Sequence, residues 1–535
     1  MSNENTAAAN DARQGVLVSA AFFTLAVIVA AFLRFYLIGI KPFHHDEGVN
    51  SYFLLDLYRT GNYKYNPQNY HGPTLYYFAL AAVKALGMND LALRFWPAVW
   101  GTLSVAILWP LRRWLGLVGT PVAAFLIALS PGLVYFSRDF IHESSFGFFS
   151  LGMAVGAWRY AETKRFGWLV LLSVSAGLLF ATKETAVITA VVLVLAALCA
   201  ALWEISRRLI RAGRFELAAV RREIWLDSWD ILPSLDHFGA AVVIFLFINV
   251  IFYSSFFTNW HGVIDAVKSV LMWTGRGTKK DGDGHYHVPT YYLGILLKLE
   301  LPLLISAVVG AVVALWRGSR FGLFAFAWAA GVGLGYSLIP YKTPWLMVSI
   351  LVPMAVLGGY AAEDVFSRPG SYTTRTIWLA AVVALLIPSA CVAWQQNFRH
   401  QADNDNNLGY LRSVGQRYQL RPWTDTQYGY AYAQSHLDLL DLERAIREAA
   451  DHMPLGRETE IYIASPEYWP LPWYLRDYPR ATFAGTLPLE LNQPIVLAES
   501  NQQAQIESMF REHYRSEPYR LRPGVDLVLY VREQP

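Results

Sequence analysis

Cysteine is scarce in this sequence. Cys199 and Cys391 are the only two cysteines among 535 residues, and both lie within apolar runs. A disulfide framework or a cysteine-ligated metal cluster needs more cysteines at suitable spacing. The sequence therefore excludes a fold that is held together by such bonds.

Charged residues are also few. Asp, Glu, Lys and Arg make up 16% of the chain and apolar residues 54%, whereas soluble globular domains contain roughly 25% charged residues. The net charge is only +3, which excludes a strongly acidic tail and the basic face of a nucleic-acid-binding protein. The composition predicts an integral membrane protein with membrane lipids, and no nucleic acid, as partners.

Long apolar stretches are abundant, and about eleven of them can cross a hydrocarbon core of roughly 30 Å as helices. We therefore predict an α-helical polytopic membrane protein. No cleavage site follows the first stretch, so we interpret it as a retained anchor. The fourth and fifth stretches lie at the lower limit of length. The predicted spans are residues 16–40, 91–110, 118–136, 145–161, 167–182, 185–204, 238–257, 291–315, 321–339, 344–362 and 376–394.

The loops indicate which side of the plasma membrane each segment faces. With the tail 1–15 inside, Lys and Arg are more frequent in the inner segments, as the positive-inside rule requires. The basic loop 205–237, with six arginines, contributes most. On this topology the loops 41–90 and 258–290 lie outside, and so does the segment 395–535.

The chain changes character after the membrane domain, which we place at residues 16–394. Residues 395–535 are polar, and apolar residues recur at helical spacing between His436 and His452. Repeats of about 20–50 residues are not evident. We predict a small extracytoplasmic α/β domain here. Its expected strands are EIYIA (460–464), PIVLA (494–498) and VDLVLYV (525–531).

Four titratable residues open the first external loop: His44, His45, Asp46 and Glu47. Two adjacent carboxylates at the mouth of a cavity can divide labour, one as general base and the other holding a cation or a substrate hydroxyl. The alternative is a solvated cluster at a helix end, where charges are common.

A second charged group, Arg138, Asp139, His142 and Glu143, follows the third predicted span. On a helix, Asp139, His142 and Glu143 would share one face. Because like charges at this spacing repel, we expect a basic partner nearby.

Basic residues gather at the same predicted membrane face. Lys183-Glu184 and Lys342 end later spans, and Arg34 and Arg94 lie near the same surface. Such a collection suits chemistry on a phosphate-linked lipid, because Arg and Lys bind phosphate and a carboxylate can remove a proton. Structural ion pairs between helices are the alternative.

Three further features each allow two interpretations. His44, His45 and His142 beside the carboxylates are candidates for holding a divalent metal, although the sequence does not require one, so the cofactor stays undefined. The stretch TGRGTKKDGDG in the loop 258–290 suits either a mobile flap or a loop without function. The stretch LPWYLRDY (471–478) would bind a glycan or only pack and dock its domain.

Several short motifs together resemble the membrane glycosyltransferases of the GT-C class, such as the protein O-mannosyltransferases (glycosyltransferase family 39-like) and the aminoarabinose transferase of lipid A. The resemblance covers residues 30–360 and extends, in detail, to a prokaryotic subfamily of flippase activity-associated membrane proteins from surface-glycosylation clusters. The motifs are Arg34 with HHDEG, LALRFWPAVWGTL, LSPGLVYFSRDFIHES, FATKETA, IPYKTPWLMV and YWPLPWYLRDY.

This resemblance implies a GT-C-like fold and a hexosyltransferase-type enzyme that uses a polyprenyl-phosphate-linked sugar. Carried onto this chain, Asp46 is the base, Glu47 supports it, Asp139 is the second acidic position and Glu143 a further candidate. The implied phosphate ligands are Arg94, Arg138, Lys183 and Lys342. The acceptor would be a cell-surface glycan, lipid or protein, and no MIR-like insertion singles out a protein.

A flippase, or a flippase-associated factor for lipid-linked oligosaccharide, is the alternative function. A transporter would be expected to carry charges at mid-bilayer and internal repeats. The sequence displays neither, so we favour sugar transfer at the outer leaflet.

Overall fold

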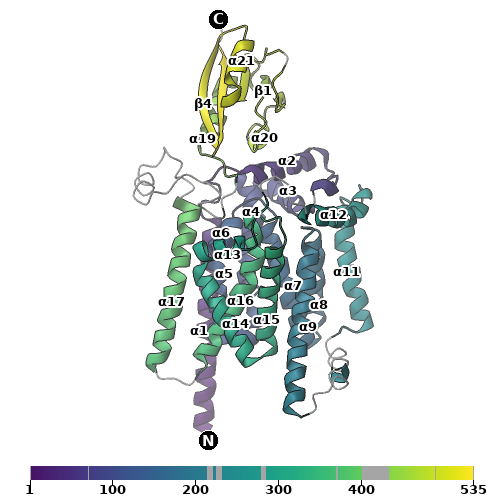
Figure 1. Ribbon diagram of the computed structural model, residues 1–535, viewed down its shortest axis with the longest axis vertical. Coiled ribbons are helices and arrows are strands. Elements are labelled where there is room, and N and C mark those ends of the chain that lie inside the picture. The colour runs from purple at the N-terminus through teal and green to yellow at the C-terminus, as the bar shows by residue number, and fades with distance from the viewer. Residues whose placement is uncertain are drawn as a thin grey trace.

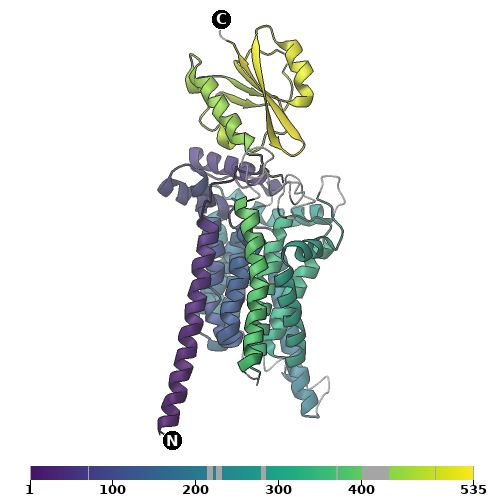
Figure 2. The ribbon, with the colours of Figure 1, turned by 90° about the vertical axis from the view of Figure 1, so that its left-hand side faces the viewer.

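A computed structural model defines the architecture of most of the chain. The helices form one bundle, and a small sheet domain is stacked on the end opposite the N-terminus (Figures 1 and 2). The loop 205–237 and the stretch TGRGTKKDGDG lie partly outside the described residues. The structure describes residues 2–69, 71–213, 221–223, 232–278, 285–368, 372–399, 430, 433–488 and 490–533.

The bundle is organised around α16, the most deeply buried apolar helix, which packs against α5, α14 and α15. By contrast, α11 buries none of its apolar window and is free to face lipid. The helices of the bundle are α1 (Ser2–Phe35), α4 (Asp90–Ala106), α5 (Arg112–Leu129), α6 (Pro131–Phe136), α7 (Glu143–Thr163), α8 (Phe166–Phe180), α9 (Ala186–Arg211), α11 (Leu235–Tyr253), α13 (Tyr291–Leu299), α14 (Leu301–Arg317), α15 (Arg320–Leu338), α16 (Met347–Phe366) and α17 (Tyr372–Trp394).

Every predicted span coincides with one of these helices or helix pairs, so the multi-pass membrane character is confirmed. The count of eleven is not. Among the described residues, seven helices are long and apolar enough to cross a membrane, or eight if the bent pair α13–α14 is one span. One of the seven, Asp90–Leu129, joins two predicted spans through a 3-10 segment, and α8 has only 15 residues.

The predicted span 291–315 is broken into two helices that meet at an angle of 110°. The break lies at Glu300, and Pro302 follows in the first turn of α14. Proline has no N–H to donate to a preceding turn, so it favours a new helix start at this point.

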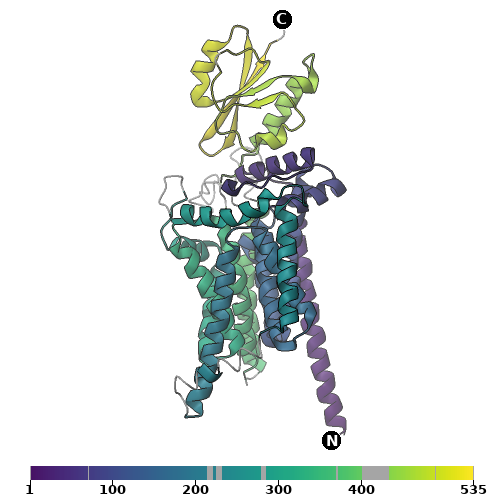
Figure 3. The same cartoon turned by 90° about the vertical axis from the view of Figure 1, so that its right-hand side faces the viewer.

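Three helices lie across the end of the bundle that carries the sheet domain: α2 (His45–Thr60), α3 (Thr74–Leu86) and α12 (His261–Thr278) (Figure 3). The first turn of α2 begins with a capping box, in which the carboxylate of Glu47 accepts the backbone N–H of His44. This cap fixes the direction in which the side chains of the first turn point.

The sheet domain has three layers. Its five strands run in the order β2-β1-β3-β5-β4, with parallel pairing on both sides of β1 and antiparallel pairing on both sides of β5. Helices α19 and α21 cover opposite faces. The predicted helix and three strands are confirmed as α19, β1, β3 and β5. The elements are α19 (Asp438–Asp451), β1 (Ile461–Ile463), α20 (Leu471–Tyr474), β2 (Ala481–Phe483), β3 (Ile495–Glu499), α21 (Gln503–Met509), β4 (Tyr514–Arg522) and β5 (Val525–Arg532).

Candidate active site

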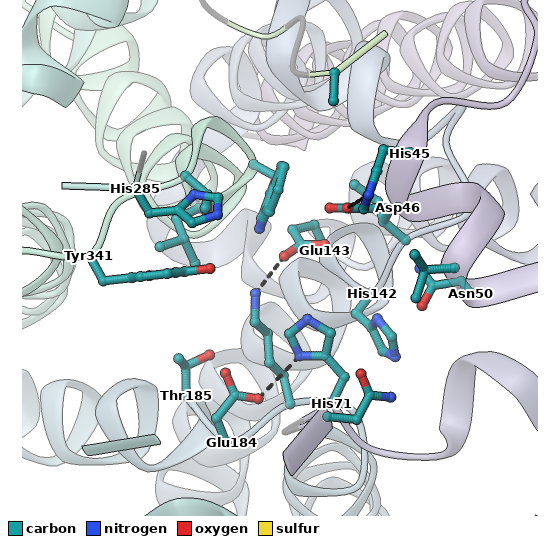
Figure 4. A pocket seen from close by; sticks show the side chains of 18 of the residues that line it. His45, Asp46, Asn50, His71, His142, Glu143, Glu184, Thr185, His285 and Tyr341 are labelled. Atoms are coloured by element: carbon teal, nitrogen blue, oxygen red, sulfur yellow. Dashed lines mark hydrogen bonds and ion pairs between the residues drawn. The ribbon is translucent and has the colours of Figure 1, made fainter. Parts of the chain in front are cut away.

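A cavity of about 550 Å³ opens between the end of the bundle and the sheet domain. Its walls come from α2, the start of α7, the turn before α9 and the sheet domain, and Figure 4 looks into it. It is rich in titratable side chains, which is typical of an active site. Those that line it include His45, Asp46, His71, His142, Glu143, Lys183, Glu184, His285, Glu467 and Arg522.

Asp46 lies on one wall of this cavity, in the first turn of α2. Its side chain is 32% exposed, and its Oδ1 lies 3.0 Å from Nδ1 of His45. Burial opposes the charged form, but the hydrogen bond from His45 and the nearby charges of His44, His45 and His71 hold the pKa of Asp46 below its usual value. Asp46 is therefore an ionised carboxylate that faces open space.

Glu47, the next residue, points away from the cavity and is fully buried. Its two oxygens accept bidentate hydrogen bonds of 2.7 Å from Arg94, and Oε1 also accepts the N–H of Phe140 at 2.7 Å. Despite burial, Arg94 and His44 hold the pKa of Glu47 well below its usual range. A carboxylate with so many donors is a weak base, so Glu47 serves as a scaffold.

The guanidinium of Arg94 is also fully engaged in hydrogen bonds. Besides Glu47, its guanidinium donates at 2.9 Å to the carbonyls of Ile38 and Lys41, and its side chain is completely buried. It ties the turn between α1 and α2 to α4. The structure therefore does not bring this predicted phosphate ligand to the cavity.

The second predicted cluster is divided by a turn. Helix α6 ends at Phe136 and α7 begins at Glu143, so the expectation that Asp139, His142 and Glu143 share one helix face is wrong. Pro131 starts α6 but no apolar helical pattern continues beyond residue 136. Asp139 forms a buried ion pair with Lys41 away from the cavity.

Glu143 remains at the cavity, where its Oε1 accepts a hydrogen bond of 2.6 Å from Nζ of Lys183. Beside this pair, Nδ1 of His71 lies 3.3 Å from Glu184, and the rings of His71 and His142 are 4.8 Å apart. Figure 4 displays Glu143, His71 and Glu184 in the same cavity as His45 and Asp46. Among the described residues that line the cavity, the one lysine, Lys183, is paired with Glu143 and not with Asp46.

Arg138 and Arg34 are buried at the ends of helices. Arg138 donates to the carbonyls of Leu33, Tyr36 and Leu37 at 2.7 to 3.0 Å, which the end of α1 leaves without helical partners. Arg34 does the same for the end of α5, at Ile127 and Ala128. Arg138 therefore caps the end of α1, and Arg34 caps the end of α5. Arg138 does not line the cavity.

Lys342 is buried beside the cavity and does not line it. Its Nζ donates to the carbonyls of His287 at 3.0 Å and Ile339 at 2.5 Å. Its neighbours Tyr341 and Thr343 do line the cavity. Lys342 therefore holds the polar turn before α16 in place.

Of the predicted site residues, the structure brings His45, Asp46, His142, Glu143 and Lys183 to one cavity. The others support the elements around it. Sequence reasoning missed His71, Asn50, Glu467 and Arg522, which also line it. His71 had a signal, because it lies in the same loop, 41–90, as Asp46, whereas nothing in the sequence links Glu467 or Arg522 to this site.

The three histidines proposed as metal ligands are separated. His44 pairs with the buried Glu47, His45 with Asp46, and Nε2 of His142 lies 3.2 Å from the carbonyl of Gly72. Within the described parts of the chain, no group of three His, Cys, Asp or Glu side chains is arranged to hold a metal ion. Their placement gives the metal option no support.

The aromatic stretch LPWYLRDY docks its domain on the loop 41–90. Trp473 is fully buried, stacks on Phe43 with 5.3 Å between ring centroids and donates through Nε1 to Asp90 at 2.8 Å. Tyr474 accepts the N–H of Phe43 at 2.8 Å. These side chains are not free for stacking on a glycan, so the docking interpretation holds for them.

Residues 70–220 match the family model described as dolichyl-phosphate-mannose-protein mannosyltransferase. At the sequence level none of the curated proteins matches the chain.

Solved structures share its fold over nearly the whole length. ArnT from Cupriavidus metallidurans in the apo state is 13% identical, with a TM-score of 0.60 over 97% of this chain and 98% of that chain. The same protein bound to undecaprenyl phosphate is 14% identical, with a TM-score of 0.55 over 95% and 97%. Archaeal oligosaccharyltransferase AglB from Archaeoglobus fulgidus, with an inhibitory peptide and a dolichol-phosphate, is 13% identical, with a TM-score of 0.53 over 92% and 70%.

The flippase-associated subfamily stays a prediction. The match over residues 70–220 is a similarity to the mannosyltransferases of that family model, and the solved structures show that the chain shares the fold of ArnT and AglB.

Proposed function

We propose that the chain transfers a sugar from a polyprenyl-phosphate donor to a hydroxyl group of a glycan, lipid or protein at the outer leaflet, with Asp46 as general base. One observation carries this assignment. Of the four carboxylates predicted to be catalytic, Glu47, Asp139 and Glu143 are each paired with an Arg or Lys, whereas Asp46, within the described part of the chain, is paired with His45 alone and faces the cavity.

In the proposed reaction, Asp46 takes the proton of the acceptor hydroxyl as its oxygen attacks the anomeric carbon. The bond between that carbon and the phosphate oxygen breaks, and polyprenyl phosphate leaves with the electron pair. Attack from the side opposite the phosphate inverts the anomeric centre. A general base of this kind contributes roughly 10²–10⁴-fold in rate.

We assign the donor phosphate to the side of the cavity that holds Lys183. The ammonium of Lys183 is paired with Glu143 there, and a phosphate would compete with Glu143 for it. His71, held by Glu184, is a second donor on the same side. Arg94, Arg138 and Lys342 are left out of this assignment because, unlike Lys183, they do not line the cavity.

The test is Asp46→Asn in purified protein, with release of polyprenyl phosphate from a panel of lipid-linked sugars as the measurement. We expect a loss of roughly 10²–10⁴-fold at unchanged melting temperature. Asp56→Asn is the matched control, because Asp56 is an exposed aspartate on the same helix, and it should keep full activity.

Full activity of a stable Asp46→Asn protein would refute the assignment and favour Glu143 or the flippase-associated function. His45→Gln distinguishes a related possibility, since it should abolish activity only if His45 itself takes the proton. Fusion reporters in the loop 205–237 and in the sheet domain test the topology, and a cytoplasmic sheet domain would contradict transfer at the outer leaflet.

A further inference from the structure

The sheet domain forms part of the wall that carries Asp46. Glu467, in the loop after β1, and Arg522, the last residue of β4, line the same cavity as Asp46 and His45. Ala433, just before α19, does so as well. The sheet domain therefore contributes side chains to the lining of the cavity.

Hydrogen bonds fix this domain to the turn that leads into α2. Three involve the backbone of Pro42 and Phe43, and the fourth involves the N–H of His45, next to Asp46. The four bonds are Gln434 Nε2 to Pro42 O at 3.2 Å, Ser435 Oγ to Phe43 O at 2.6 Å, Phe43 N to Tyr474 Oη at 2.8 Å and His45 N to Ala433 O at 3.3 Å.

A close backbone approach adds to these bonds. Gly48, in the first turns of α2, lies so near Pro470 that a Cβ on Gly48 would be 2.5 Å from the Cα of Pro470. Only glycine permits this approach. The distance between Asp46 and the loop of Glu467 is thereby set by rigid contacts.

Glu467 and Arg522 form an ion pair in which the two side chains differ in exposure. The side chain of Arg522 is only 9% exposed, and it also donates to the carbonyl of Trp469 at 3.0 Å. The side chain of Glu467 is 50% exposed. The arginine is thus the fixed partner, and the carboxylate is the group that a ligand in the cavity meets.

An ionised carboxylate accepts hydrogen bonds and donates none. Asp46 and Glu467 both line the cavity, and the loop of Glu467 lies beside the first turn of α2, since the ring of Trp469 is 6.3 Å from that of His45. A ligand between these two carboxylates must supply O–H or N–H donors. An anionic group there would meet two like charges, which is a repulsive element that discriminates between ligands. The side of the cavity that holds Lys183 suits the phosphate.

We propose that Glu467, held in place by Arg522, is an acceptor-recognition residue that accepts hydrogen bonds from hydroxyl or amino groups of a sugar acceptor and disfavours acidic sugars. This inference rests on the proposed function, because it takes the wall of Asp46 as the acceptor side. It names the acceptor as a neutral or amino sugar.

The experiment uses the full chain in lipid nanodiscs and three probes: hexyl glucoside, its 2-amino-2-deoxy analogue and hexyl glucuronide. Dissociation constants are measured by ligand-observed NMR for wild type and Glu467→Gln. Wild type should bind the glucuronide most weakly. In Glu467→Gln, the dissociation constant of the glucuronide divided by that of hexyl glucoside should be smaller than in wild type by roughly three- to tenfold. This is the effect of one charge-assisted contact.

Glu460→Gln is the matched control. Glu460 lies in the same domain, its side chain is also 50% exposed, it also pairs with an arginine, Arg480, and it does not line the cavity. This variant should leave all three constants unchanged. Binding of undecaprenyl phosphate should be the same in all proteins, because the phosphate side is not altered.

The inference is overturned if Glu467→Gln leaves the preference unchanged, if Glu460→Gln changes it equally, or if wild type binds none of the three glycosides. Failure of the proposed function gives a different result: undecaprenyl phosphate does not bind, and Asp46→Asn has no effect on transfer. The two failures can therefore be told apart.

Discussion

Two regions near the start of α2 can be compared: a layer of buried charges and the cavity. Both contain acidic and basic side chains, but these side chains differ in their exposure to solvent. In the buried layer, Glu47 and Arg94 have no exposed side-chain surface, and Lys41 and Asp139 have almost none. In the cavity, Asp46 and His45 are each about one third exposed. Adjacent residues in the sequence, Asp46 and Glu47, thus belong to two different environments.

This difference predicts two classes of mutational effect. Removing one partner of a buried ion pair leaves an uncompensated charge in a medium of low dielectric, which is costly. Removing a partly exposed charge leaves a group that water can still solvate, so folding is little affected. Stability should depend on the buried layer, and activity on the cavity.

Glu47→Gln should have the largest effect on stability. It leaves Arg94 buried beside a neutral amide, which should cost about 3–5 kcal/mol, whereas Asp46→Asn should cost less than about 1 kcal/mol. Thermal unfolding and the yield of folded protein in detergent measure both. If the two variants unfold at the same temperature, the distinction between buried layer and cavity is wrong.

Gly48→Ala should have an intermediate effect on stability. Gly48 lies in α2 directly after Asp46 and Glu47, and it packs against Pro470 of the sheet domain. A new methyl group against Pro470 should cost about 1–3 kcal/mol and displace Asp46, so that transfer slows while binding of undecaprenyl phosphate is unchanged. Gly39→Ala is the control, since its added Cβ meets no atom within 4 Å. Equal behaviour of the two variants would show that Pro470 does not position α2.

His44→Gln should have the smallest effect on stability, below about 1 kcal/mol, because Glu47 keeps its two hydrogen bonds from Arg94 and is not left uncompensated. This effect should depend on pH. Burial opposes protonation of His44, but the hydrogen bond and charge of Glu47, with Asp139 and Asp46, raise its pKa above 6.5. The protonated form therefore adds stability that is complete below pH 6.5 and is lost as pH rises through the raised pKa.

The difference in melting temperature between wild type and His44→Gln, followed from pH 5.5 to 9, checks this sign. It should shrink as pH rises. His452→Gln, at the exposed histidine that follows the last residue of α19, should yield no such trend. A difference that stays constant or grows with pH would contradict a charged His44.

The fold was largely predictable because lipid-facing helices and buried strands impose hydrophobic patterns that are local in sequence. The break at Glu300 was not predicted, because the residues on both sides of it are apolar and Pro302 alone does not reveal that the two helices meet at 110°. Strand β4 was also missed. Its sequence, YRSEPYRLR, is polar because much of the strand is exposed.

The candidate site was predictable only in part. Asp46 and Glu143 could be named because carboxylates at the ends of apolar helices are rare and costly. The roles of the basic residues could not be predicted. Arg94, Arg138 and Lys183 all follow or begin apolar helices in the sequence, and they differ only in the groups that they contact across the fold. Arg94 reaches Glu47, Arg138 reaches the end of α1, and Lys183 reaches Glu143.

The turn before α2 is synthesised early and is held in part by Arg94 of the bundle, whereas the sheet-domain groups that also hold it, from Ala433 to Tyr474, are synthesised much later. Since domains generally fold as units, the N-terminal ones first during synthesis, a nascent chain contains every bundle helix before the sheet domain can complete the contacts of this turn. Asp46 would reach its working position only after the sheet domain has folded against that turn. Glycosyl transfer would then begin only on completed chains, so that unfinished or truncated copies consume no lipid-linked sugar.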